Sequence, residues 1–378
     1  MGIIKNIFRD HWDQFVADHP QMIRDSVHKE VNRMLKCGLI ENGFTIYRCS
    51  ECQNEVLVPF TCKSRFCTSC GKLYRDKWAE KLESRLINAP HKHLVFTIPE
   101  ELRIYFRKDR TLLKDLSDQA AKVIKETIYE MNKTQRFETG LISVIHTFGR
   151  DLKWNPHVHI IMCLRCLGKT EDRTIRYLNY KKLRMFWQKE LLDLMKKRFP
   201  TKIMRSLINK LYKQKENGFY VYAQGEITNL EIISKYLARY AGRPAIAESR
   251  IIGYDGSNVT IKYVPHGENK EVQETMTADE FIQRLIIHIP ETHFKMMRNY
   301  GIYSRNNGRA KRIERRLVSK EKYERLKKLK TWQFRLMLEY DRNPLKCECG
   351  ALMKKDGIVV PGDREIMERY RWEGQNAG

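Results

Sequence analysis

The sequence has no apolar segment of the length that crosses a membrane. No window approaches 18 consecutive apolar residues, and residues 1–10 contain no apolar core of signal-peptide length. Internal repeats and low-complexity tracts are also absent. The lack of a long apolar segment argues against a membrane-spanning protein, and we expect a cytosolic protein with no membrane partner.

Acidic residues are the minority of the charged residues. Among 378 residues, 46 Asp and Glu stand against 71 Lys and Arg, so the formal net charge is +25. A hydrophobic content of 42% with 10% aromatic residues is that of a folded chain, long enough for two or three domains. A positive excess spread along the chain indicates a polyanionic partner. Nucleic acid is favoured over an anionic membrane, because no basic amphipathic anchor stands out.

Disulfides are not expected in the cytosol, so the spacing of the ten cysteines indicates metal binding or packing. Two Cys-x-x-Cys pairs, Cys49 with Cys52 and Cys67 with Cys70, are separated by fourteen residues. This spacing predicts a zinc ribbon in which each pair supplies two thiolates to one tetrahedral shell. Cys37 remains as a buried thiol, a replacement ligand or part of a second site, and so does Cys62. Basic residues around the second pair form either a DNA-contacting rim or a solvated face.

Two histidines flank one valine in the apolar segment 154–162. If residues 157–162 form a strand, its period of two places His157 and His159 on one face. Alone, the pair is also compatible with two polar residues on a wet sheet surface. A hairpin that turns at residues 151–152 would bring His146 opposite His157 and supply a third imidazole for a divalent metal. The alternative for His146 is a core histidine bonded to a carbonyl group.

A helix capped by Asn229 is predicted to carry two tyrosines on one face. Tyr236 and Tyr240 are four residues apart, hence one helical turn apart. Paired tyrosines are most often packing residues. Near a metal and cations, however, a phenol can act as a nucleophile toward phosphate. Three cations adjoin this pair: Lys235, Arg239 and Arg243.

The remaining patterns predict an α+β fold. We expect helices over residues 1–36 (interrupted at Pro20), 100–133, 178–215 and 229–240, and from residue 281 onward; we expect strands over 93–98, 140–148, 157–162, 218–224, 259–264 and 271–276. Thr277–Glu280 is a capping pattern for the last helix.

The combination of a His-x-His strand with a downstream tyrosine helix resembles the HUH single-strand endonucleases. Five segments narrow the match to rolling-circle insertion-sequence transposases of the two-tyrosine type, and they occur in the same order as in that family. The segments are 61–70 (TCKSRFCTSC), 146–159 (HTFGRDL followed by PHVH), 236–243 (YLARYAGR), 276–282 (MTADEFI) and 298–302 (RNYGI). The likeness extends from about residue 10 to residue 310.

This resemblance implies an HUH-type antiparallel sheet flanked by helices. It divides the chain into an N-terminal helical and zinc-ribbon domain (1–88), an endonuclease domain (89–260) and a basic helical C-terminal region (261–378). It also implies the cofactors, Mg²⁺ or Mn²⁺ at His146, His157 and His159 and structural Zn²⁺ at Cys49, Cys52, Cys67 and Cys70. Near the C-terminus, Cys347-Glu348-Cys349-Gly350 resembles a shortened zinc knuckle. We do not expect a complete second zinc site there.

The implied activity is that of a transposase that cuts and rejoins single DNA strands in a prokaryotic cytoplasm, at the nucleoid. Tyr236 or Tyr240 would become linked to a 5′ phosphate, while Lys235, Arg239 and Arg243 would contact DNA. The one-sided positive charge of segment 309–330 also favours contact with the DNA backbone over a solvated helix. One alternative is a non-catalytic, zinc-containing DNA-binding regulator. Another is a metal-dependent phosphohydrolase that uses a metal-bound water as its nucleophile.

Overall fold

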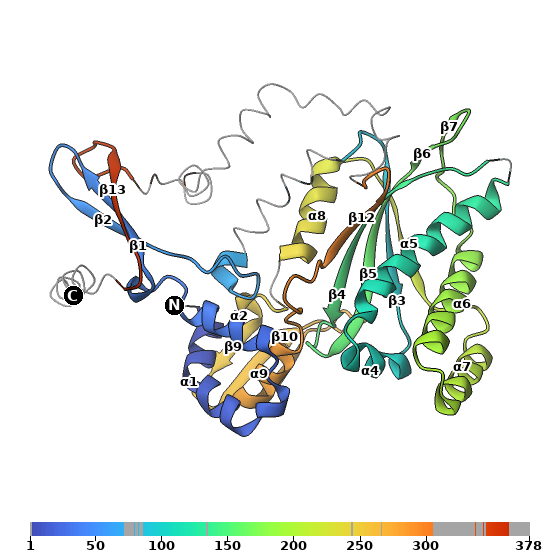
Figure 1. Cartoon of the computed structure of the whole chain (residues 1–378), viewed down its shortest axis with the longest axis horizontal. Helices are drawn as coiled ribbons and strands as arrows, with labels where there is room; N and C mark the ends of the chain where they lie inside the picture. The colour runs from blue at the N-terminus through green and yellow to red at the C-terminus, as the bar shows by residue number, and fades with distance from the viewer. Residues whose placement is uncertain are drawn as a thin grey trace.

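A five-stranded antiparallel sheet forms the centre of the computed structural model (Figure 1). The structure describes residues 2–71, 79, 82, 86–133, 135–242, 245–265, 267–304, 337, 343 and 345–362. In order across the sheet, the strands are β12 (Met297–Gly301), β4 (Gly140–Phe148), β5 (Trp154–Cys163), β3 (His91–Thr97) and β8 (Val221–Ile227). The predicted antiparallel sheet is therefore confirmed.

Helices cover both faces of this sheet, which explains why successive residues of β4 and of the second half of β5 are buried. On one face, Leu94, Val158 and Ile160 pack against a helical layer. This layer consists of α4 (Glu100–Lys108), α5 (Leu112–Met131), α6 (Tyr180–Arg198) and α7 (Lys202–Gln214). On the other face, Val144 and Ile161 pack against α8 (Leu230–Gly242). A small hairpin, β6 (Arg165–Leu167) with β7 (Asp172–Thr174), extends from the end of β5.

A second core joins helices from the beginning of the chain to a segment more than 200 residues later. Its elements are α1 (Ile3–Asp18), α2 (Asp25–Leu35), α9 (Ala278–Ile286) and the sheet formed by β9 (Ile251–Tyr254), β10 (Asn258–Tyr263) and β11 (Val272–Thr277). Phe8 and Phe15 of α1 share this core with Phe281 of α9. Figure 1 shows α1, α9 and this sheet side by side below α8. The N-terminal helices therefore bury their apolar faces against the later segment.

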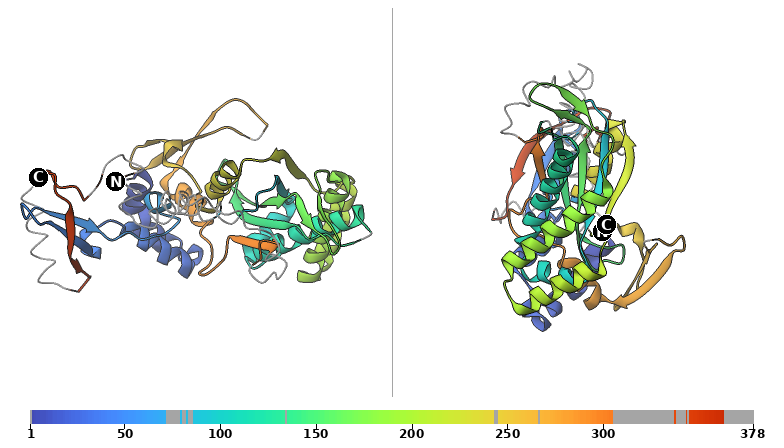
Figure 2. Two further views of the ribbon diagram at one scale, coloured as in Figure 1. Left: turned by 90° about the horizontal axis from the view of Figure 1, so that it is seen from above. Right: turned by 90° about the vertical axis from the view of Figure 1, so that its right-hand side faces the viewer.

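A third unit is a small sheet of β1 (Phe44–Cys49), β2 (Glu55–Pro59) and β13 (Met353–Val359). Figure 2 shows that it projects from the end of the molecule opposite α6 and α7. The three consecutive segments 1–88, 89–260 and 261–378 thus exchange elements in the structure. The last segment supplies β12 to the central sheet, α9 to the second core and β13 to the third unit.

Local signals in the sequence agree with the structure at several points. The Asn229 side chain accepts hydrogen bonds from the backbone N–H groups of Glu231 and Ile232, as expected of a helix cap. Thr277 caps α9 by accepting from the N–H of Glu280. The basic segment 309–330 lies outside the described residues. Among the described helices, none combines the length and the apolar character that crossing a membrane requires.

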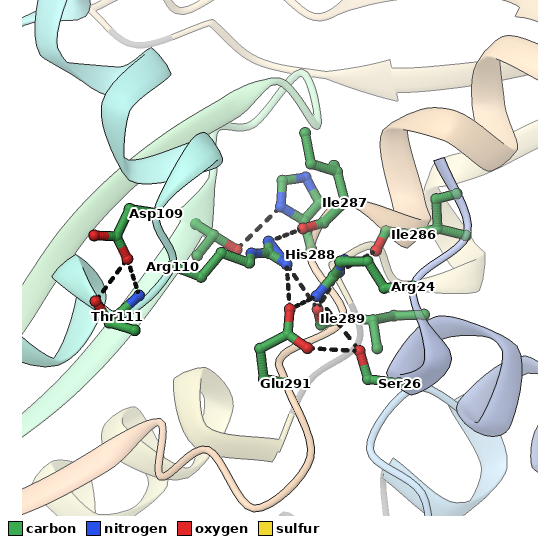
Figure 3. A network of polar contacts seen from close by, with 11 residues as sticks. Arg24, Ser26, Asp109, Arg110, Thr111, Ile286, Ile287, His288, Ile289 and Glu291 are labelled. Atoms are coloured by element: carbon green, nitrogen blue, oxygen red, sulfur yellow. Dashed lines mark hydrogen bonds and ion pairs between the residues drawn. The ribbon is translucent and has the colours of Figure 1, made fainter. Parts of the chain in front are cut away.

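Two arginines and one glutamate join the second core to the central domain (Figure 3). Arg24, just before α2, and Arg110, between α4 and α5, both donate to the carbonyl of Ile289, at 2.7 and 3.1 Å. Glu291 forms ion pairs with both arginines and accepts a hydrogen bond from Ser26 at 3.1 Å. Arg110 is only 12% exposed, and burial, reinforced by the charge of Arg24, lowers its pKa to about 10. Glu291 therefore balances two like charges at this junction.

Replacing Glu291 with Gln should destabilise the protein, because it leaves Arg24 and Arg110 facing each other with no carboxylate. We expect a loss of about 1–3 kcal/mol, larger at low salt, measured as a lower thermal midpoint in calorimetry. The matched control is Glu280→Gln in α9. There Arg284 keeps its second ion pair, with Glu274, so the change should stay below about 0.5 kcal/mol. Equal effects of the two substitutions would contradict the proposed role of Glu291.

Candidate active site

Three histidines meet on the face of the central sheet that α8 covers. In the pairing of β4 with β5, His146 lies directly opposite His157, as predicted. His159 is two residues further along β5 and therefore on the same face. One ring nitrogen from each of the three imidazoles lies within 4.8 Å of the others. The geometry thus brings together the three predicted metal-ligating residues.

Hydrogen bonds determine which nitrogen of His157 can bind a metal. Its Nδ1 lies 2.7 Å from the carbonyl oxygen of Asn155. Because a carbonyl only accepts, Nδ1 carries the proton, which leaves the Nε2 lone pair as the ligand. Burial lowers the pKa of His157 to about 4. Burial also lowers the pKa of His159 well below its usual value, with a further contribution from neighbouring imidazoles. Neutral imidazoles at pH 7 are the form that metals require, so this donor set fits a divalent cation.

A fourth histidine, which the sequence analysis left without a role, connects this triad to the tyrosine helix. His93 of β3 lies opposite Ile161 and so shares the face of His159. Its Nε2 is 3.0 Å from Nδ1 of His159, and its Nδ1 is 3.3 Å from the hydroxyl of Tyr236. Burial lowers the pKa of His93 to about 4. The sequence signal was a second His-x-His, His91-Lys92-His93, which ends at the first residue of the predicted strand 93–98.

The apolar side of α8 places Tyr236 at this site. Ile233 and Leu237 are fully buried against the sheet, which holds the intervening half-buried Tyr236 over His93, with ring centroids 4.8 Å apart. Tyr240 follows one turn later on α8. The side chains of Tyr240 and Arg239, and all of Arg243, lie outside the described part of the chain. The Lys235 side chain is 67% exposed and pairs with Glu231 at 2.6 Å.

A cavity of about 420 Å³ lies at the end of β4, and His146 is among its lining residues. Four basic residues also line it and are called the basic wall here: Lys29, Arg33, Lys63 and Arg65. The acidic residues Glu30 and Glu291 line the same cavity. Lys29 and Lys63 are exposed and form no ion pair with a described residue.

The predicted zinc ribbon needs a correction. Cys67 and Cys70 do not share a shell with Cys49 and Cys52; they cluster with Cys37 and Cys62. Sγ of Cys70 lies 3.6 Å from the Sγ atoms of both Cys37 and Cys62. Backbone N–H groups also donate to sulfur, Cys62 N–H to Cys37 at 3.3 Å and Ser64 N–H to Cys62 at 3.4 Å. Such contacts are typical of the ligands of a structural zinc.

Cys49 and Cys52 belong to a different cluster, with Cys347 and Cys349. The expectation that the C-terminal Cys-x-Cys could not complete a zinc site overlooked this pairing. Its two halves are about 300 residues apart, so no local spacing reveals them. Both clusters are four-cysteine sets in which all sulfur atoms lie within 4.8 Å of one another.

Comparison with known proteins gives a match for the cysteine-rich N-terminal part and another for the part that contains β4, β5 and α8. Residues 7–98 match a family described as a transposase zinc-binding domain, and residues 140–311 match a family described as a putative transposase. The transposase for insertion sequence element IS801 of Pseudomonas savastanoi pv. phaseolicola is 30% identical over 316 residues, 79% of this chain and 75% of that protein. The putative transposase y4qJ of Sinorhizobium fredii is 23% identical over 318 residues, 79% of each chain. No solved structure shows a significant match. The chain therefore belongs to the family of insertion-sequence transposases that includes the IS801 transposase.

Proposed function

We propose that this transposase cuts and rejoins single DNA strands by a rolling-circle mechanism in which Tyr236 is the first nucleophile. The observation that carries the proposal is the continuous contact from the Tyr236 hydroxyl through His93 to His159 of the triad. Tyr240, one turn along α8, is the second nucleophile, which allows a second strand to be linked or the first to be rejoined. Substrate DNA and the family activity are consistent with the excess of basic residues.

The hydrogen bonds along this contact favour an ionised Tyr236. Nδ1 of His159 is engaged by His93, so Nε2 is the nitrogen of His159 that would bind a metal. Nδ1 of His159 then carries the proton and donates it to Nε2 of His93. A neutral His93 consequently holds its own proton on Nδ1, which donates to the oxygen of Tyr236. A phenolate oxygen is the form best stabilised by such a donor.

The cleavage step is a transesterification. The Tyr236 oxygen, after losing its proton to solvent, forms a bond to the scissile phosphorus while the bond to the 3′ oxygen breaks. The product is a 5′-phosphotyrosine and a 3′ oxygen that takes up a proton from water. Mg²⁺ or Mn²⁺ held by His146, His157 and His159 would polarise the phosphate and stabilise its developing charge. The exposed Lys235, with Arg239 and Arg243, is proposed to bind neighbouring phosphates.

The basic wall of the cavity is the proposed approach path of the strand. Lys29 and Lys63 are exposed there, and His146 lines the same cavity. A phosphate backbone entering beside these cations would reach the end of β4, where His146 of the triad lies. Charge of this kind binds any sequence, so it positions the strand without selecting it.

Two other functions use some of the same features. A non-catalytic regulator would need no tyrosine beside a histidine cluster, and a phosphohydrolase using water would need no phenol. The Tyr236–His93 contact favours the tyrosine mechanism over both. The first of the three predictions below separates them.

The first prediction concerns a covalent adduct. Incubation with a single-stranded oligonucleotide of the element end and Mn²⁺ should give a protein–DNA adduct that survives denaturing electrophoresis. The double variant Tyr236→Phe, Tyr240→Phe should form none, and Tyr236→Phe alone should slow the first cleavage at least about a thousandfold. Tyr222→Phe is the matched control, because Tyr222 is an exposed phenol 6.5 Å from the His93 ring centroid. Cleavage that persists in the double variant would establish a water nucleophile and overturn the proposal.

The second prediction concerns metal binding. Mn²⁺ titrated into the zinc-loaded protein and followed by electron paramagnetic resonance should bind more than about tenfold more weakly after His157→Ala. His93→Ala should weaken binding by about ten- to a hundredfold, because His93 orients His159. His11→Ala is the control. His11 contacts Tyr254 of β9, which belongs to a different sheet from the one that carries the triad. Unchanged Mn²⁺ affinity in His157→Ala would remove the triad from the site.

The third prediction concerns the path of the strand. Replacing Lys29 and Lys63 with Ala should weaken single-strand binding and reduce the slope of log affinity against log salt by about 1.4, for two lost phosphate contacts. The control replaces Lys196 and Lys197, two exposed cations near the end of α6 on the opposite side of the sheet. A larger effect of the α6 substitutions would show that the strand follows that helix and not the cavity.

A further inference from the structure

Two turns at opposite ends of the chain have the same design. In the first, after β1, the N–H of Cys49 bonds to the carbonyl of Asn54 and the N–H of Gln53 bonds to that of Cys49, at 2.9 and 3.1 Å. Gln53, directly after the second cysteine, has a left-handed φ of 62°. The left-handed conformation reverses the chain within a few residues and directs Cys49 and Cys52 to one side.

The second turn precedes β13. The N–H of Cys347 bonds to the carbonyl of Ala351, and the N–H of Gly350 bonds to that of Cys347, each at 2.9 Å. Gly350, directly after the second cysteine, has a φ of 91°, which glycine adopts readily. Each turn therefore consists of a cysteine pair closed by one left-handed residue, the local geometry of a zinc knuckle.

The two turns face each other, and their sulfur atoms interleave. Sγ of Cys49 lies 3.5 Å from that of Cys349, and Sγ of Cys52 lies 3.4 Å from that of Cys347. A tetrahedron with zinc–sulfur distances of about 2.3 Å separates its sulfur atoms by about 3.8 Å, close to these values. All four cysteines are free thiols, so no disulfide occupies the position.

The surrounding sheet has few apolar contacts of its own. The buried residues at one end are Phe44, Ile46 and Val359, and those at the cysteine end are Cys49, Leu345, Cys347 and Met353. Three strands with so little buried apolar surface are marginal in water. Arg48 adds ion pairs to Glu55 of β2 and Asp356 of β13, but it is 42% exposed and such pairs contribute little. A metal that binds only the folded arrangement supplies the missing stability.

We propose that Cys49, Cys52, Cys347 and Cys349 bind a second structural zinc that clamps β13 to the N-terminal hairpin. The matched family regions, residues 7–98 and 140–311, contain only the first pair of these ligands. The site is separate from the Cys37, Cys62, Cys67, Cys70 cluster and does not depend on the proposed cleavage mechanism. It anchors the C-terminal strand β13 to β1.

Zinc content of the full-length protein tests the proposal. Protein purified under reducing conditions and measured by plasma mass spectrometry should contain two zinc ions per chain. Cys347→Ser combined with Cys349→Ser should contain one. Cys163→Ala, which removes a buried thiol outside both clusters, should still contain two. One zinc in the wild type, or two in the Cys347→Ser, Cys349→Ser variant, would overturn the proposal.

Hydrogen exchange separates loss of the clamp from general unfolding. In the Cys347→Ser, Cys349→Ser variant, the amides of β13 and β1 should lose protection, while those of β4 and β5 keep it. A chelator added to the wild type should reproduce this pattern in β13, and added zinc should reverse it. Protection of β13 that is unchanged in both the variant and the chelated wild type would show that strand pairing alone holds the segment, and would overturn the clamp.

Discussion

The pairing of β4 with β5 is the constraint on which the candidate active site depends. Side chains alternate across a strand, so a shift of one residue in this pairing would send His146 to the opposite face from His157 and His159. The opposite face is filled by Val158, Ile145 and their neighbours, which pack against α5 and its adjoining helices. The apolar pattern therefore fixes the register, and the register fixes the triad. Burial of the imidazoles then follows from α8 covering the polar end of the same face.

The tip of this hairpin is held by the second core, which connects distant parts of the chain to the triad. Leu152, with a left-handed φ of 63°, is fully buried among the residues of α1, β10 and α9. Its carbonyl accepts a hydrogen bond from His288 at 2.8 Å, and Arg284 donates to the carbonyl of Asp151 at 3.3 Å. A leucine in this conformation costs about 1–2 kcal/mol, which the surrounding core offsets. The N-terminal helices and α9 thus support the geometry of the histidine triad, to which they contribute no residue.

The sequence predicted those parts of the site that depend on short-range patterns. Alternation predicted the two strands, the loop at 151–152 predicted the hairpin, and the Asn229 cap predicted the start of the helix that carries Tyr236. The role of His93 could not be predicted without knowing the order of strands across the sheet. β3 and β5 are neighbours in the sheet, although α4, α5 and β4 lie between them in the sequence. The prediction of the zinc ligands was wrong for a related reason. Two Cys-x-x-Cys pairs at ribbon spacing suggested one site, whereas Cys37 and Cys62 approach Cys67 and Cys70 from one side and Cys347 and Cys349 reach Cys49 and Cys52 from the other end of the chain.

Distant parts of the chain share the same sheets and cores, and this connects the first cysteine cluster to the central sheet. The first zinc cluster follows α2, and α2 is tied to the central domain through Arg24, Glu291 and Arg110. The basic wall of the cavity, on α2 and beside Cys62, is therefore held in the same cavity as His146 by this junction. A strand bound along that wall is placed relative to the triad by the fold of the second core and not by a flexible linker. In the proposed mechanism, positioning of this kind would lower the entropy cost of bringing a phosphate to Tyr236, so the zinc-binding part of the chain would contribute to catalysis through geometry alone.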